Sequence, residues 1–130
     1  MTEQTRLVEE ALAAQVQARA PYSHYPVGAA VLTGSGKIFH GCNVESGAYG
    51  TTICAERVAI FAALAAGETE LSALAVITRD GGTPCGACRQ VIFEQCGEIP
   101  IYIASNDGNA VQAFTTGELL PKPFSFHDKR

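Results

Sequence analysis

Three cysteines in two stretches of the chain constrain its fold more than any other feature. Cys54 opens the stretch Cys-Ala-Glu-Arg, and Cys85 and Cys88 lie in a later stretch, Pro-Cys-Gly-Ala-Cys-Arg. The apolar patterns that follow predict one helix over 54–66 and another over 85–96, with a proline where a helix N-terminus tolerates it. Cys85 and Cys88 then share the first helical turn and face the same way. Three thiols at this spacing are typical of a zinc site at the ends of two helices.

The number of ligands indicates the kind of zinc site. A structural zinc usually has four protein ligands, whereas a catalytic zinc keeps one position for water. Cys96 is excluded as a fourth ligand because it lies about 12 Å beyond Cys88 along a helix. Cys42 lies in a different segment and stays open as an alternative. Glu56 reaches the open side of the metal only if Cys54 stands at the extreme end of its helix, because residues two apart point about 200° apart. We therefore predict one Zn²⁺ per chain, with Glu56 as a proton carrier rather than a ligand.

The composition is that of a globular protein with an acidic balance. Of its 130 residues, 47% are hydrophobic and 17% are charged, and the net charge is −4 at pH 7. This charge gives no electrostatic reason to bind nucleic acid, whose affinity comes largely from Lys and Arg. No apolar run approaches the roughly 20 residues of a membrane span, and the polar N-terminus is unlike a secretory signal. We expect the five cysteines to be thiols in a cytoplasmic protein, with residues 1–130 forming a single catalytic domain.

The remaining segments predict a layered α/β fold. An amphipathic helix is expected over 2–19, with Val8, Leu12 and Val16 on its buried face and Gln15 in water. The other expected elements are a hairpin of strands at 27–32 and 37–43, strands at 71–78, 99–104 and 110–114, and a helical turn at 118–120 behind a capping box of Thr115 and Glu118. This order predicts a three-layer α/β/α sandwich with a five-stranded mixed sheet.

Taken together, the motifs resemble those of the small, tetrameric cytidine deaminases. The resemblance covers about residues 7–124. It is carried by Pro21-Tyr22-Ser23, Val27-Gly28-Ala29-Ala30, Gly41-Cys42-Asn43-Val44-Glu45, Cys54-Ala55-Glu56-Arg57, Pro84-Cys85-Gly86-Ala87-Cys88-Arg89-Gln90 and Glu118-Leu119-Leu120-Pro121. It implies hydrolytic deamination of cytidine and 2′-deoxycytidine to uridine and 2′-deoxyuridine plus ammonia, in pyrimidine salvage. It also implies zinc ligation by Cys54, Cys85 and Cys88, catalysis by Glu56, and a homotetramer whose active sites are shared between subunits.

The resemblance also assigns residues to the substrate. Asn43 and Glu45 correspond to the residues that hold the ribose in this family. From the sequence alone, turn chemistry at the end of a strand is the alternative for both. Tyr25 takes the place of a Phe that lies against the pyrimidine ring, and its added hydroxyl needs a partner. Ala55 is expected beside the substrate as well.

Other residues are expected to act between subunits or on the metal. The family resemblance implies that Ala48 and Tyr49 lie in a loop bordering a neighbour's active site, and that Phe124 reaches into a neighbour's site to meet the base. Arg57 is expected to donate hydrogen bonds to a thiolate and so withdraw negative charge from the zinc site. A surface ion pair is the alternative for Arg57. Phe126 has no counterpart in the family.

Three other functions stay open at this point. A relative acting on a cytosine-containing antibiotic such as blasticidin S would keep the chemistry, although Asn43 and Glu45 favour an ordinary ribose. An editor of RNA or DNA is disfavoured by the acidic balance and the lack of a basic stripe. A structural zinc module closed by Cys42 would leave Glu56 without a role.

Overall fold

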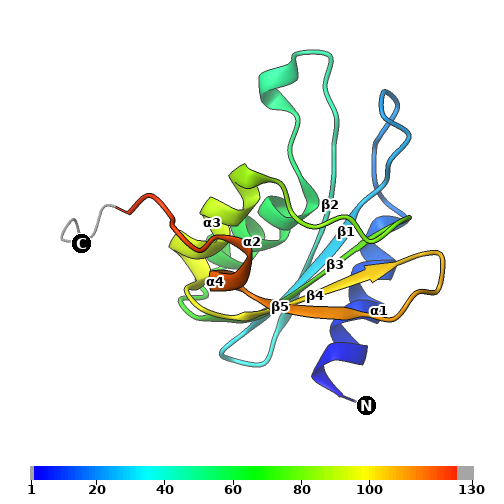
Figure 1. Ribbon diagram of the computed structural model, residues 1–130. Coiled ribbons are helices and arrows are strands. Elements are labelled where there is room, and N and C mark those ends of the chain that lie inside the picture. Colours follow the sequence, from blue (N-terminus) through cyan, green and yellow to red (C-terminus); the bar gives the residue numbers. More distant parts are fainter. Residues whose placement is uncertain (1, 126–130) are drawn as a thin grey trace.

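The structure is a computed structural model that describes residues 2–125 (Figure 1). Its elements in chain order are α1 (Glu3–Gln15), β1 (Gly28–Thr33), β2 (Ile38–Cys42), the 3₁₀ turn η1 (Tyr49–Thr51), α2 (Ala55–Ala65), β3 (Leu71–Thr78), α3 (Gly86–Cys96), β4 (Pro100–Ser105), β5 (Gln112–Thr115) and α4 (Thr116–Leu119). The five strands lie in the order β2-β1-β3-β4-β5. β3 and β4 are parallel, and the other neighbouring pairs are antiparallel. Phe126 lies outside the described residues.

Helices cover both faces of the sheet, and the central strand supplies side chains to both sides. On β3, Leu74 and Val76 belong to the hydrophobic cluster that includes α2 and α3. Ala75 and Ile77 of the same strand belong to a second cluster beneath α1. This explains the uninterrupted apolar run of β3, because a strand buried on both faces has no solvent side for polar residues. The predicted three-layer α/β/α sandwich with a five-stranded mixed sheet is confirmed.

Two glycines let helices lie directly on the sheet. A Cβ atom on Gly28 of β1 would come within 2.0 Å of the Ala11 carbonyl oxygen in α1. A Cβ atom on Gly41 of β2 would come within 2.2 Å of the Ala55 carbonyl oxygen in α2. Glycine inside a strand indicates such a close approach of another backbone. The contact at Gly41 also positions the start of α2, where four of the predicted site residues lie: Cys54, Ala55, Glu56 and Arg57.

The first helix differs from its prediction in length and in orientation. Leu12 and Val16 are 45% and 77% exposed, so the predicted buried stripe is wrong at both positions. Gln15 is buried instead, and its amide donates to the Pro26 carbonyl at 3.0 Å and to the Asn106 side chain at 2.8 Å. The helix ends before residue 19 because the Arg19 backbone pairs with the chain beyond β2, donating to the Asn43 carbonyl at 2.9 Å. Tertiary pairing thus overrides the helical pattern.

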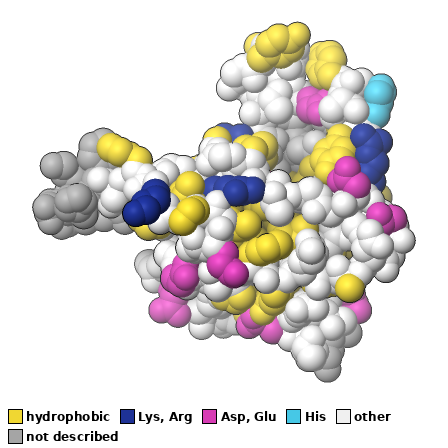
Figure 2. Space-filling model, viewed as in Figure 1, with side chains coloured by type: hydrophobic (Ala, Val, Ile, Leu, Met, Phe, Trp, Pro, Cys, Tyr) yellow, Lys and Arg dark blue, Asp and Glu magenta, His cyan; other side chains and the backbone are white. Residues whose placement is uncertain are grey.

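The surface carries no broad basic region on the face seen in Figure 2. Lys and Arg side chains lie there in small, separate groups, whereas hydrophobic side chains gather at the tip of the projection between β2 and α2 (Figures 1 and 2). Within residues 2–125, no helix has the length and apolar character needed to cross a membrane.

Candidate active site

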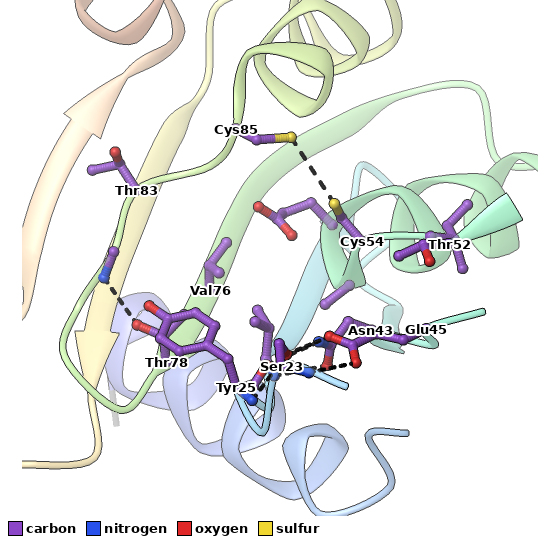
Figure 3. A pocket seen from close by; sticks show the side chains of 15 residues that line it. Ser23, Tyr25, Asn43, Glu45, Thr52, Cys54, Val76, Thr78, Thr83 and Cys85 are labelled. Atoms are coloured by element: carbon purple, nitrogen blue, oxygen red, sulfur yellow. Dashed lines mark hydrogen bonds between the residues drawn. The ribbon is translucent and has the colours of Figure 1, made fainter. Parts of the chain in front are cut away.

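A pocket lies at the end of the sheet where β1 begins and where β2 and β3 finish, beside the ends of these strands rather than along an edge strand. The strand register pairs Gly28 with Cys42 and with Ile77, which places these three strand ends side by side. The cavity has a volume of about 390 Å³, within the usual range for small-molecule sites. Its lining residues precede β1, follow β2, lie at the end of β3 or lie at and before the starts of α2 and α3: Ser23, Tyr25, Val27, Asn43, Glu45, Thr52, Ile53, Cys54, Ala55, Glu56, Val76, Thr78, Gly82, Thr83 and Cys85 (Figure 3).

Three thiols form a cluster at one end of this pocket. Cys54 is the N-cap residue of α2, Cys85 is the N-cap of α3, and Cys88 lies in the first turn of α3. Their sulfur atoms all lie within 4.8 Å of one another, and those of Cys54 and Cys85 are 3.9 Å apart (Figure 3). Zn–S bonds of about 2.3 Å in tetrahedral geometry hold two sulfurs about 3.8 Å apart, so the spacing fits zinc. Among the described residues, neither Cys42 nor Glu56 belongs to this cluster, which removes the basis for a site closed by Cys42.

The electrostatics of the thiols also fit a bound cation. Hydrogen bonding with Cys88, together with Arg57, lowers the pKa of Cys54 to about 5. The same interaction with Cys54, reinforced by burial, raises the pKa of Cys88 well above its usual range. Ionisation of one thiol therefore opposes ionisation of the next, and a divalent cation is the natural compensation. The N-termini of α2 and α3 meet at the cluster and favour negative charge there.

Glu56 is the second residue of α2 and is only 4% exposed. Burial, reinforced by the charge of Cys54, raises the pKa of this carboxyl to about 7. The side chain lines the pocket without joining the thiol cluster. Its position satisfies the condition drawn from the sequence, because Cys54 does stand at the extreme end of the helix. A buried carboxyl with a pKa near neutrality is suited to accept and to donate a proton.

Arg57 lies against the thiols rather than in a surface ion pair. Its Nη2 donates to the Cys54 sulfur at 3.3 Å, and these thiolates raise the pKa of the guanidinium. Its Nε is buried and has no hydrogen-bond partner within residues 2–125. The only ion pair among those residues joins His40 and Glu10, so the alternative of a surface pair for Arg57 is not observed.

Asn43 and Glu45 lie at the other end of the pocket, and both hold the loop before β1. The Asn43 side chain accepts from the Val27 N–H at 2.9 Å and donates to the Tyr25 carbonyl at 2.9 Å. Glu45 accepts from the backbone N–H groups of Tyr22 and Ser23, each at 3.0 Å, and from the Ser23 hydroxyl. These bonds lower the pKa of Glu45. The turn chemistry weighed for both residues is therefore present, and each side chain keeps hydrogen-bonding capacity toward the pocket.

The hydroxyl of Tyr25 has the partner that the sequence analysis required. It donates to Asp80 at 2.5 Å, and the Arg79 guanidinium lies 4.9 Å from the ring centre. Figure 3 shows Tyr25 beside Thr78 in the wall of the pocket. Burial, with the Asp80 carboxylate, raises the pKa of Tyr25. Sequence reasoning missed Thr78, Arg79 and Asp80 as parts of this wall. The available signal was their place at the end of a buried strand and directly after it, because ligands often bind where such strands end.

Comparison with known proteins assigns the chain to a family. Residues 1–103 match the family model described as the cytidine and deoxycytidylate deaminase zinc-binding region. The chain is a member of this family. A curated relative, the cytidine deaminase of Sporosarcina psychrophila, is 47% identical over 126 residues, which cover 95% of this chain and 92% of the relative.

Solved structures of the family have the same fold. The crystal structure of cytidine deaminase from Burkholderia pseudomallei matches with a TM-score of 0.89 and 46% identity, covering 95% of this chain and 100% of that one. The cytidine deaminase structure from Mycobacterium tuberculosis matches with a TM-score of 0.83 and 37% identity, covering 96% and 99%. The resemblance read from the motifs is thus confirmed at the level of the family.

Three residues that the family resemblance placed near a substrate do not line this chain's own pocket. Ala48 and Tyr49 lie at the projection between β2 and α2, where Tyr49 is 91% exposed (Figure 1). Phe124 lies on the segment after α4 and is 62% exposed, with its carbonyl accepting from the Gln90 amide at 2.8 Å. Their expected contribution was to a neighbouring subunit, and that role stays a prediction.

Proposed function

We propose that the protein hydrolyses cytidine and 2′-deoxycytidine to uridine and 2′-deoxyuridine with release of ammonia, in pyrimidine salvage. The observation that supports this most is the buried carboxyl of Glu56 in the wall of the same pocket as an open cluster of three thiols. The relatives and solved structures named cytidine deaminase support a nucleoside as the substrate.

The mechanism follows from the proton chemistry of Glu56. Cys54, Cys85 and Cys88 would hold zinc, which would lower the pKa of a water molecule and make it nucleophilic at neutral pH. Glu56 accepts a proton from the attacking water and delivers it to ring N3 as the C4–O bond forms. It then carries the second proton to the amine, so that the C4–N bond breaks and ammonia leaves.

Charge on the metal site is the second requirement of the mechanism. Three thiolates on Zn²⁺ leave a net charge of −1, which weakens the activation of water. The hydrogen bond from Arg57 to Cys54 and the two helix N-termini draw part of this charge away. We propose that this tuning is the role of Arg57.

The far end of the pocket would hold the sugar. Asn43 retains one amide hydrogen and one lone pair after its two hydrogen bonds to the loop, and the Glu45 carboxylate retains a lone pair after three. Ribose hydroxyls both donate and accept, so they match these free positions. Ala55, the first residue of α2, has a backbone N–H with no intrahelical acceptor and lines the pocket, which suits it to a polar edge of the base. The Tyr25 ring supplies the aromatic wall.

The assembly is proposed to be a homotetramer in the cytoplasm. Support comes from the exposed aromatic side chains of Tyr49 and Phe124, which lie away from the chain's own pocket. The structure joins none of the five cysteines in a disulfide, which suits a reducing compartment. Light scattering on a size-exclusion column tests the assembly: a mass of four chains is expected, and a monomer with full activity would contradict it.

Turnover of cytidine, 2′-deoxycytidine, cytosine and blasticidin S, followed by ultraviolet absorbance, tests the substrate. We expect rapid turnover of the two nucleosides and little of cytosine. Glu45→Gln should reduce the preference for cytidine over cytosine, whereas a purely structural loss would lower both activities in proportion. Turnover of blasticidin S alone would keep the chemistry and refute the salvage role.

A further inference from the structure

The three thiols of the cluster are held in place by different means. Cys88 is completely buried in the first turn of α3, so packing fixes its side chain. Cys54 receives a hydrogen bond from Arg57 at 3.3 Å. Cys85 is exposed, and within residues 2–125 the only hydrogen-bond contact of its sulfur is with Cys54. The position of the Cys85 sulfur therefore depends on the backbone that carries it.

Arg89, one turn further along α3, holds that backbone from both sides of Cys85. Its Nε donates to the Pro84 carbonyl at 2.7 Å, and its Nη2 donates to the Thr83 hydroxyl at 2.8 Å. Its own backbone N–H donates to the Cys85 carbonyl at 2.9 Å. Arg89 thus contacts the Pro84 and Cys85 carbonyls, one on each side of the Cys85 side chain, and also the Thr83 hydroxyl.

The third side-chain hydrogen bond of Arg89 links the Thr83–Cys85 segment to the end of α4. Nη1 donates to the carbonyl of Leu119 at 2.7 Å, at the end of α4, and Leu119 itself is buried in the core. The planar guanidinium presents its donors in a fixed fork, so three bonds in different directions define one position for the Thr83–Cys85 segment. A lysine ammonium is a point charge on a flexible stem and does not reproduce this geometry.

We propose that Arg89 is a positioning residue for the metal: its three side-chain hydrogen bonds hold the backbone of Cys85 where the exposed thiol completes the zinc cluster. The inference concerns metal binding and deepens the proposed function without depending on the substrate. Partners outside the ligand shell typically change metal affinity by 10- to 100-fold when they are removed. Removing the three side-chain hydrogen bonds of Arg89 should therefore lower the affinity for zinc by about 10- to 100-fold.

Release of zinc from the purified holoprotein to a chromogenic chelator tests this role. Arg89→Lys should speed zinc release by about 10- to 100-fold. Thr83→Val removes one of the three bonds and leaves Arg89 intact, so it should speed release by about 5-fold, the value of one ordinary hydrogen bond. The cobalt(II)-loaded Arg89→Lys protein should also show an altered thiolate-to-metal absorption spectrum, because the Cys85 sulfur is displaced.

Glu98→Ala supplies the matched control. Glu98 accepts from the Gly117 N–H at 2.7 Å and so links the end of α3 to α4 without touching the Cys85 segment. We expect it to release zinc at the wild-type rate with an unchanged cobalt spectrum. Wild-type release from Arg89→Lys, or equally fast release from Glu98→Ala, would overturn the role of Arg89. If Arg89→Lys does not fold, Thr83→Val decides, and its release at the wild-type rate would overturn the proposal. Failure of the proposed function is a different result, namely a wild-type protein that binds zinc and turns over no nucleoside.

Discussion

Glu56 should lower the stability of the zinc-free protein at neutral and alkaline pH. Burial raises its pKa from 4.5 to about 7, so the folded state binds the proton more tightly than the unfolded state does. The protonated carboxyl contributes its full stability below pH 4.5, and this contribution is lost as the pH rises through about 7. At about 1.4 kcal/mol per pKa unit, the loss is about 3 kcal/mol. Glu56→Gln, which is uncharged at all pH values, should therefore make the zinc-free protein more stable than wild type by about 3 kcal/mol at pH 8, and by almost nothing at pH 4.

Urea unfolding of both zinc-free proteins across this pH range, with the thiols kept reduced, measures the difference. Glu9→Gln is the control, because Glu9 is exposed on α1 and its replacement should change stability by less than about 0.5 kcal/mol at every pH. The same substitution should lower kcat by about 10⁴-fold, since the proton carrier is gone. Equal stability of the two proteins at pH 8, or a difference that does not vary with pH, would refute the burial argument.

Four further substitutions, one of them with a matched glycine control, probe the tuning of the metal, the pocket wall and the start of α2. Arg57→Ala should lower kcat by roughly 10-fold or more while zinc stays near one per chain, and unchanged turnover in a zinc-loaded variant would count against the tuning role. Tyr25→Phe removes the exposed hydrogen bond to Asp80, and Asp80→Asn weakens it, so each should raise KM for cytidine by less than about 10-fold at constant kcat. A large fall in kcat in steady-state assays would contradict this. Gly41→Ala should lower the free energy of unfolding by roughly 3 kcal/mol or more, and with it the melting temperature, because its Cβ would come within 2.2 Å of a backbone oxygen. Gly50→Ala is the control, since a Cβ there meets open space and should leave the melting temperature unchanged. Equal melting temperatures of the two variants would refute the packing argument.

Two parts of the thiol cluster were predictable because their geometry is local, whereas the pairing of Cys54 with Cys85 and Cys88 rested on the family resemblance. Cys85 and Cys88 share one helical turn, and the relation of Cys54 to Glu56 required Cys54 to cap its helix, as the structure confirms. The fold class was predictable for a similar reason, since the apolar run of β3 has no other stable place than the middle of a covered sheet. That residues 1–130 form a single catalytic domain stays a prediction.

Other features depend on contacts between distant segments and were not predictable. The buried face of α1 was misassigned because Gln15, a polar residue, finds partners at Pro26 and Asn106 that no local pattern reveals. Tyr25 precedes β1, whereas Asp80, the partner of its hydroxyl, follows β3. Only the pairing of the start of β1 with the end of β3 brings the two residues together. The link from Arg89 to Leu119 likewise joins two segments far apart in sequence.

The most direct test of the central claim measures zinc content and ammonia release from cytidine in the same sample. Both are measured before chelation, after chelation and after zinc is restored. We expect about one zinc per chain and rapid ammonia release, loss of both on chelation, and recovery of both with added zinc. Zinc bound at one per chain with no ammonia released from cytidine or 2′-deoxycytidine would contradict the proposed function and point to a structural site. Full activity in the zinc-free protein would contradict the role of the three thiols.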